Sequence, residues 1–148
     1  MSGLKVLFIG GSGIISSACS RLAVERGIEL VVLNRGVNRQ RPLPSQCTVL
    51  QADVRDPAAM RQALGGMEFD AVVDWVAFTP DHVRADLDLF RGRTGQYVFI
   101  SSASAYQTPP ARLPVVESTP LRNPFWQYSR DKIACEDLLV GAYRDQGF

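Results

Sequence analysis

Short apolar runs alternate with longer segments of mixed polarity along the whole chain. The runs predict strands at Val6–Ile9, Glu29–Leu33, Cys47–Leu50, Asp70–Val76 and Gln96–Ser101. Their apolar residues mostly follow one another without polar interruption, which is typical of parallel strands buried on both faces. Each run is followed by a segment long enough for a helix. We therefore predict an α/β fold, a doubly wound parallel sheet with helices on both faces.

Helix signals occupy the intervening segments. We expect helices at Ile14–Arg26, Pro57–Gly65, Pro80–Phe90 and Gln127–Arg144. Asp56 stands as an N-cap ahead of Pro57, and Gly65 stands where that helix stops. A turn is expected at Gly92–Gly95, and a proline-bearing loop at Thr108–Pro124. The expected inward face of the first helix consists of Ile14, Ile15, Ala18, Leu22 and Ala23.

Composition narrows the class of protein. The chain has 148 residues, of which 46% are hydrophobic and 21% charged, as in a folded soluble domain. Its formal net charge of +1 gives no electrostatic reason to expect nucleic acid or an anionic membrane as partner. No apolar run approaches the roughly 20 residues of a membrane span, and no signal-peptide pattern precedes the first strand. The three cysteines lack metal-ligand spacing, so we expect reduced thiols, no metal site and a cytoplasmic location.

The chain closes on a helix pattern with Gly147 placed as its C-cap. Alternating α/β chains usually continue from such a helix into another strand. We therefore expect residues 1–148 to form one nucleotide-binding domain, the N-terminal part of a longer protein.

A glycine-rich turn follows the first predicted strand directly. The residues Gly10-Gly11-Ser12-Gly13 lead at once into the helix start at Ile14 and Ile15. Such a turn directs backbone N–H groups and the positive end of a helix dipole at an anion, usually a pyrophosphate. Gly10 permits the sharp turn, and Gly13 lets phosphates approach the backbone. We expect all six positions, 10 to 15, to contact a dinucleotide, although flexible turns also collect glycine.

Residues that follow two further strands are candidates to contact the adenosine half of the dinucleotide. A basic residue after the second strand favours the 2′-phosphate of NADP, whereas an acidic one favours NAD. Here Asn34 and Arg35 occupy that place, with Arg39 and Arg41 nearby, so we expect the cofactor to be NADP. The alternative cofactor is NAD. Arg35 would then be an ordinary solvated charge of the loop. Asp53 and Val54 end the third strand and are expected at the adenine, unless Asp53 merely caps a turn.

The strongest chemical pattern combines a tyrosine and a lysine with paired serines. Tyr128 and Lys132 lie four residues apart, one above the other on a helix face. A lysine ammonium held near a phenol stabilises the phenolate, and a serine hydroxyl from Ser101 or Ser102 can orient a substrate oxygen beside it. Proton transfer by Tyr128 coupled to hydride transfer with a nicotinamide follows as a mechanism.

Four motifs in order give this chain a family resemblance. The stretches GGSGIIS, DVRD at positions 53–56, YVFISSASAY and YSRDK together resemble the extended short-chain dehydrogenase/reductase family, the NAD(P)-dependent epimerases and dehydratases. The resemblance covers essentially all 148 residues and implies a Rossmann fold. It further implies that Tyr128 is the general acid/base, that Lys132 is its partner and a nicotinamide-ribose ligand, and that Ser102, four residues before Tyr106, is the catalytic serine. Ala77, after the fourth strand, is expected against the cofactor.

The chain also departs from that family's pattern. Ser16 stands where the third glycine of the fingerprint is expected, so we expect looser packing between helix and strand. The segment 74–78, DWVAF, is similar to an atypical branch that includes chloroplast stem-loop RNA-binding relatives. The C-terminal substrate domain that the family carries is absent from these 148 residues.

Three functions are compatible with these patterns. The first is an NAD(P)-dependent epimerase, dehydratase or reductase acting on a small molecule such as a nucleotide sugar. The second is a nucleotide- or RNA-binding protein that kept the scaffold and lost catalysis; the near-neutral charge counts against RNA. The third is a non-catalytic fragment. The resemblance also implies a homodimer through Pro80–Phe90 and Gln127–Arg144.

Several residues near these motifs have ordinary structural explanations. His82, at a predicted helix start, is expected to be a surface or capping residue. Trp75 and Phe78 are expected to pack in the core, with contact to a nicotinamide as the alternative. Phe125 and Trp126 either line the pocket or form a hydrophobic staple at the helix start.

Overall fold

A computed structural model describes residues 3–37 and 40–148; Arg39, proposed above beside the phosphate site, lies outside them. The chain divides into two compact units, one of Met1–Val76 with Leu89–Ile100, the other of Ala77–Asp88 with Ser101–Phe148. The elements in order are β1 (Lys5–Ile9), α1 (Ile14–Glu25), β2 (Glu29–Asn34), β3 (Thr48–Gln51), α2 (Pro57–Leu64), β4 (Phe69–Asp74), α3 (Pro80–Phe90), β5 (Thr94–Phe99), η1 (Ala103–Ala105) and α4 (Gln127–Gln146).

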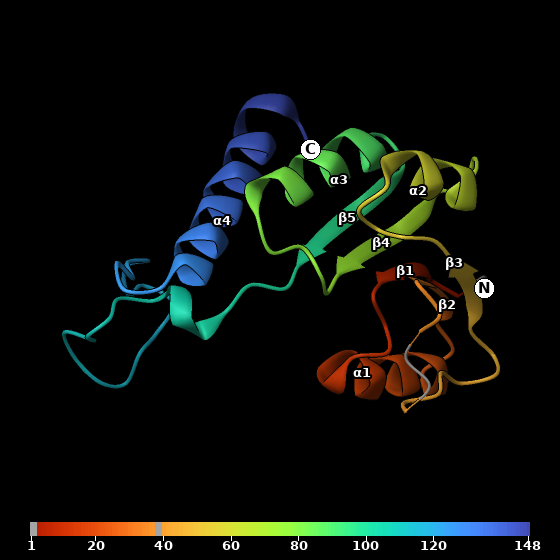
Figure 1. Cartoon of the computed structure of the whole chain (residues 1–148), viewed down its shortest axis with the longest axis horizontal. Coiled ribbons are helices and arrows are strands. Elements are labelled where there is room, and N and C mark those ends of the chain that lie inside the picture. The colour runs from red at the N-terminus through yellow and green to blue at the C-terminus, as the bar shows by residue number, and fades with distance from the viewer. Residues whose placement is uncertain (1–2, 38–39) are drawn as a thin grey trace. The chain divides into compact units, whose positions relative to one another are not determined.

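The first unit contains one parallel sheet with the strand order β3-β2-β1-β4-β5. Helix α1 lies on one face of this sheet and α2 on the other (Figure 1). This confirms the predicted doubly wound parallel sheet. The order reverses between β1 and β4, and in such sheets ligands bind beyond the carboxyl ends of the strands at the reversal. The glycine turn follows β1, at that place.

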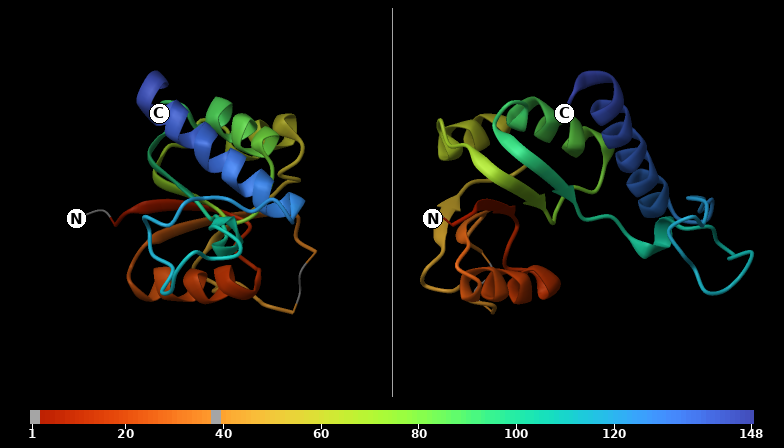
Figure 2. Two further views of the ribbon diagram at one scale, coloured as in Figure 1. Left: turned by 90° about the vertical axis from the view of Figure 1, so that its left-hand side faces the viewer. Right: turned by 180° about the vertical axis from the view of Figure 1, so that it is seen from behind.

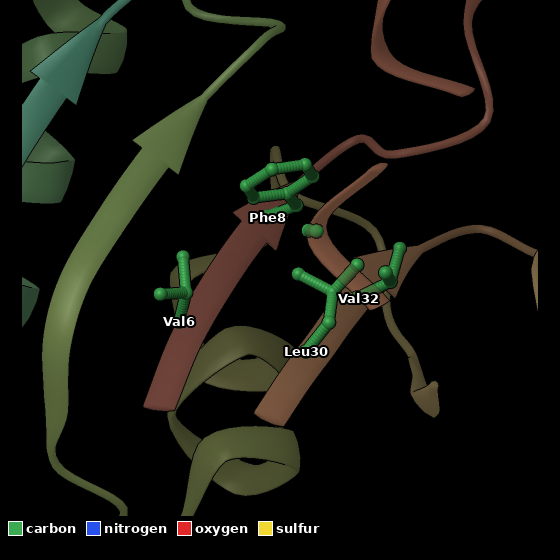
Figure 3. Packing of buried hydrophobic residues seen from close by; sticks show 5 residues of the cluster. Val6, Phe8, Leu30 and Val32 are labelled. Carbon is green, nitrogen blue, oxygen red and sulfur yellow. The ribbon is translucent and has the colours of Figure 1, made fainter. Parts of the chain in front are cut away.

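The core of the sheet forms where β1 and β2 pair in register. Val6 lies beside Leu30 and Phe8 beside Val32, all four buried on one face of the sheet (Figure 3). Ala23 of α1 completes this cluster. Because β1 is covered on both faces, its residues from Val6 to Ile9 are all buried, which explains the uninterrupted apolar run.

The predicted inward face of α1 was wrong. Ile14, Ile15, Ala18 and Leu22 are exposed, and only Ala23 of the predicted set is buried. The buried residues of α1 are instead small, Ser16, Ser17, Ser20 and Ala23. Small side chains allow the helix to lie close to the glycine turn, as the contact of Ser20 Oγ with the Gly11 carbonyl oxygen at 3.0 Å shows.

The strand boundaries also needed correction. β4 spans Phe69–Asp74, so Trp75 and Val76 lie beyond it, in the segment that was assigned to the strand. β5 begins at Thr94 and ends at Phe99, two residues earlier than predicted at each end, so the expected turn at Gly92–Gly95 overlaps the strand. Apolar residues that pack at a strand end look the same in the sequence as those inside the strand.

The capping signals of α2 were correct. Asp56 Oδ1 accepts hydrogen bonds from the backbone N–H groups of Ala58 and Ala59, and Pro57 occupies the first helical turn. Gly65 ends the helix with a φ of +50°. Local side-chain chemistry therefore sets both ends of this helix.

In the second unit, the short helix η1 contacts α4, and the loop between them lies at the N-terminal end of α4 (Figure 2). A single β-bridge pairs Tyr106 with Leu121 within this loop. α4 runs two residues beyond the predicted end at Arg144, and the left-handed Gly147 is its C-cap, as predicted. Among the helices of the described residues, none is long and apolar enough to cross a membrane.

Candidate functional site

The turn after β1 requires glycine for steric reasons. Gly10 has a φ of +100°, and a Cβ built on it would lie 2.8 Å from Val76 Cγ1. A Cβ on Gly11 would lie 2.7 Å from Val32 Cγ1. The backbone N–H of Gly10 donates to the Leu33 carbonyl at 2.8 Å, which anchors the turn to β2. The chain therefore bends sharply at the reversal point of the sheet and presents bare backbone there.

The N-terminus of α1 is open to an anion. Its N-cap is Gly13, which has no side chain to satisfy the first-turn N–H groups, and no acidic residue lies in the first turn. The neighbouring side chains of Ile14 and Ile15 are 78% and 68% exposed, so solvent reaches this end of the helix. Free N–H groups at the positive end of a helix dipole fit a dinucleotide's pyrophosphate.

Ser16, at the place of the third fingerprint glycine, is accommodated by a hydrogen bond. It is buried, and its Oγ accepts from the Gly13 N–H at 2.8 Å. The helix packs closely at this position despite the side chain. The hydroxyl also fixes the backbone of Gly13, which a glycine at position 16 would leave to solvent or ligand.

The end of β2 presents an arginine that is free to bind. Asn34 Oδ1 accepts from the Gly36 N–H at 2.7 Å and so shapes the turn. Arg35 is exposed, and its guanidinium has no hydrogen-bond or ion-pair partner among residues 3–37 and 40–148. Its role as a phosphate ligand stays a prediction.

In the turn after β3, Asp53 acts as a turn cap, which was one of its two expected roles. Its Oδ1 accepts from the backbone N–H of Arg55 at 2.9 Å, so the side chain caps a turn. Asp53 is nonetheless exposed and Val54 half-buried beside it. An adenine contact by these two residues is compatible with the turn and stays a prediction.

In the second unit, the lysine of the motif is buried and held in place. Lys132 is 1% exposed, and its Nζ donates to the Ala77 carbonyl at 2.6 Å. The same ammonium lies 5.8 Å from the centroid of the Tyr128 ring and 5.1 Å from that of Phe78. A buried ammonium gains stabilisation from a carbonyl oxygen and from aromatic faces. The structure thus gives Ala77, expected against the cofactor, a direct part in holding Lys132.

Tyr128 lies one helical turn before Lys132 and carries a free hydroxyl. Its ring contacts those of Trp126, at a centroid distance of 4.8 Å, and Phe78, at 6.3 Å. The Tyr128 hydroxyl makes no hydrogen bond within the described part of the chain. Phe78 is exposed and contacts Tyr128, so its assignment to the core was wrong, whereas Trp75 packs edge-on against Phe8 in the core as predicted.

The geometry separates the two candidate serines. Ser101 Oγ donates to a carboxylate oxygen of Glu136 on α4 and is therefore occupied. Ser102 is the N-cap of η1, where its Oγ accepts from the Ser104 N–H at 3.2 Å. Ser102 is half-buried, and no carboxylate among the described residues engages its hydroxyl.

His82 has the capping role expected of it. Its Nδ1 accepts from the backbone N–H of Phe78 at 3.1 Å, ahead of α3. This contact fixes the start of the helix and leaves no reason to assign His82 to catalysis.

Thiol and metal chemistry have no support. The described residues contain no group of three or more histidine, cysteine, aspartate or glutamate side chains that could hold a metal ion. The three cysteines are free thiols. Burial raises the pKa of the Cys47 thiol, which makes it a weaker nucleophile near neutral pH.

The candidate residues are thus assembled within each unit. The glycine turn, Arg35 and Asp53 follow the adjacent strands β1, β2 and β3 of one sheet, and Tyr128, Lys132 and Ala77 are brought together in the other unit. Residues 6–91 match the NAD dependent epimerase/dehydratase family. The chain belongs to this family.

The relatives of this family member include sugar-nucleotide epimerases. A UDP-glucose 4-epimerase of Streptomyces lividans is 31% identical over 95% of this chain and 48% of its own length. The solved UDP-glucose 4-epimerase of Brucella ovis, a complex with NAD, is 24% identical with a TM-score of 0.84, over 99% of this chain and 50% of the other. That of Bifidobacterium longum, with NAD and UDP, is 21% identical with a TM-score of 0.78, over 95% and 50%. The chain spans about half the length of the curated relatives it matches.

Proposed function

We propose that this protein is a nicotinamide-dinucleotide-dependent epimerase that acts on a UDP-sugar. The observation that carries the proposal is the buried Lys132 ammonium, held on the Ala77 carbonyl one helical turn from the free hydroxyl of Tyr128. A buried ammonium beside a tyrosine is the arrangement that proton transfer by a phenol requires. The names of the relatives supply the reaction and the sugar nucleotide.

The fit of the cofactor rests on the turn after β1. The first turn of α1 would hold the pyrophosphate, because its N-cap Gly13 offers no side chain to the first-turn N–H groups, and Gly10 and Gly13 leave the backbone of the turn bare. Asp53 and Val54 would contact the adenine, and Lys132 the nicotinamide ribose. When bound, the dinucleotide supplies the acceptance and return of a hydride.

The protein's own residues would handle the proton. Tyr128 takes the proton of a substrate hydroxyl as that carbon loses its hydride, and gives it back when the resulting carbonyl is reduced. Lys132 holds a positive charge beside this tyrosine, 5.8 Å from the centroid of its ring. Ser102 orients the substrate oxygen by a hydrogen bond. What supports these proposed roles is the resemblance of the motif at the matching positions, together with the contacts of Lys132 described above.

The direct test is turnover by the 148-residue chain. With dinucleotide present, UDP-galactose is expected to convert to UDP-glucose, measured by chromatography of the sugar nucleotides. Binding of the dinucleotide is followed in parallel by its fluorescence. Binding without any product would favour the non-catalytic alternatives and contradict the proposed activity.

We further propose that the cofactor is NADP, with NAD as the alternative that the complexes of the solved relatives favour. Arg35 carries this choice, because its guanidinium, which pairs with none of the described residues, suits the 2′-phosphate. Arg35→Ala is expected to weaken NADPH binding about 10- to 100-fold and to leave NADH binding unchanged, measured by fluorescence titration. Arg26→Ala, which removes an exposed charge after α1, is the matched control. Equal affinity of the unaltered protein for the two cofactors would rule out the preference.

A further inference from the structure

Three hydroxyl groups and one amide form a continuous hydrogen-bonded chain in the second unit. Asn123 Nδ2 lies 3.3 Å from Ser129 Oγ, and Ser129 Oγ lies 2.9 Å from Ser104 Oγ. Ser104 Oγ in turn lies 2.8 Å from Ser102 Oγ. The chain of contacts starts at two buried residues, Asn123 and Ser129, and ends at the half-buried Ser102. It connects the interior beside α4 with the candidate catalytic serine.

The orientation of the Asn123 amide is set by backbone groups on both sides. Its Oδ1 accepts from the Phe125 N–H at 3.1 Å, and its Nδ2 donates to the Ser104 carbonyl at 2.9 Å. A backbone N–H can only donate and a carbonyl can only accept. The flipped amide would place donor against donor and acceptor against acceptor, so Nδ2 faces Ser129 as a donor.

The Asn123 amide is the first donor of this chain, and the later directions depend on the acceptors within reach of each serine proton. A serine hydroxyl has one proton and two acceptor sites. Ser129 is buried and accepts from Asn123, and its proton is donated to Ser104 Oγ, the acceptor it has among the described residues. Ser104 accepts from Ser129, and its 2.8 Å contact with Ser102 allows either oxygen as the donor; we assign the proton to Ser104, because Ser102 Oγ is the other oxygen within its reach among the described residues. Ser102 Oγ also accepts from the Ser104 N–H at 3.2 Å, so both of its acceptor sites are occupied. The proton of Ser102 is the only hydrogen-bonding capacity that it has left.

We propose that this relay makes Ser102 an obligate donor to the substrate oxygen, with Asn123, Ser129 and Ser104 as positioning residues. The inference rests on the proposed function for the identity of the substrate oxygen. It divides the proton chemistry between two groups: Ser102 donates to the oxygen throughout, and Tyr128 alone accepts its proton. A serine with a rotatable proton would exchange these roles with the substrate hydroxyl.

The direction of the relay can be observed without any turnover. A neutron structure of the deuterated 148-residue chain is expected to place the Ser129 deuteron towards Ser104 Oγ and the Ser104 deuteron towards Ser102 Oγ. The Ser102 deuteron is then expected to point away from Ser104. A Ser102 deuteron directed at Ser104 Oγ would overturn the relay, whether or not the chain proves to be an epimerase.

The effect of the relay on catalysis is tested by a double-mutant cycle in which the rate of epimerisation is measured. Ser102→Ala is expected to lower kcat about 100-fold and Ser104→Ala about tenfold, with KM changed less than about twofold in each. In the Ser102→Ala background, Ser104→Ala is expected to cost nothing further, because the relay acts only through Ser102. Equal losses in both backgrounds would assign Ser104 a merely structural role and overturn the proposal.

Two further serine variants serve as controls for the double-mutant cycle. Ser118→Ala, at an exposed serine of the same unit, is the control for serine truncation and is expected to keep full activity. Ser129→Ala cuts the relay one step earlier, and thermal melting shows whether each variant is folded. Absence of turnover in the unaltered protein would contradict the proposed function instead, and the deuteron positions would still decide the direction of the relay.

Discussion

Replacement of Gly10 by alanine is expected to lower the free energy of unfolding by about 3 kcal/mol. Two costs add at this position. A φ of +100° is unfavourable for a residue with a Cβ, by roughly 1–2 kcal/mol. The Cβ would also lie 2.8 Å from Val76 Cγ1 and 3.4 Å from Trp75 Cβ, and overpacking of a filled site costs about 1–3 kcal/mol. The measurement is urea denaturation followed by circular dichroism.

Gly66→Ala provides the matched control. No heavy atom lies within 4 Å of a Cβ at Gly66, and its φ lies outside the left-handed range, so alanine is tolerated there. The expected change is within about 0.5 kcal/mol. If the two variants unfolded at the same urea concentration, strain at the β1 turn would not be the reason for the glycine, and a role in ligand approach alone would remain.

The layout of the sheet was predictable because a strand that is buried on both faces consists mostly of consecutive apolar residues. β1, β2 and β4 appear in the sequence as apolar runs, and strand–helix alternation then restricts the sheet to parallel pairing. The inner face of α1 was not predictable in the same way. Its contact with the glycine turn requires small volume, and Ser16 and Ser20 supply it although neither is apolar. Hydrophobic periodicity therefore predicts burial of Ile14 and Ile15, which are exposed.

Part of the candidate site could be predicted from the spacing of residues in the sequence, and the rest is visible only in the structure. The four-residue spacing of Tyr128 and Lys132 follows from the period of a helix and was visible at once. Lys132 donates to a backbone carbonyl, that of Ala77. Every residue type has such a carbonyl, so the sequence does not show which one accepts. The relay from Asn123 to Ser102 was missed for a related reason. Serine and asparagine are common in loops, and nothing in their spacing shows that Asn123 and Ser129 are buried.

The choice between the adjacent serines shows the same limit. Ser101 and Ser102 lie two and three residues after the end of β5, and both offer a hydroxyl near the end of the strand. Only the position of Glu136 on α4, which engages Ser101, leaves Ser102 for a ligand. Partners 35 residues apart in sequence are not linked by any local pattern.

Replacement of Tyr128 by phenylalanine is expected to lower turnover about 1,000-fold, within the usual range for loss of a general acid/base. The change removes one oxygen and keeps the ring, so the contacts with Trp126 and Phe78 are retained. The Lys132 ammonium also keeps its hydrogen bond to the Ala77 carbonyl. Dinucleotide affinity, measured by fluorescence titration, is therefore expected to change less than about twofold, and KM for the sugar nucleotide little.

Tyr143→Phe is the matched control, because Tyr143 lies on the same helix with 75% of its surface exposed. The same oxygen is removed far along α4 from the Tyr128–Lys132 pair, and turnover is expected to be unchanged. If Tyr128→Phe kept more than about a tenth of the original rate, the proton would be accepted by another group. The buried lysine would then lose its proposed purpose, since an ammonium placed beside a tyrosine serves proton transfer only if that hydroxyl is the one that reacts.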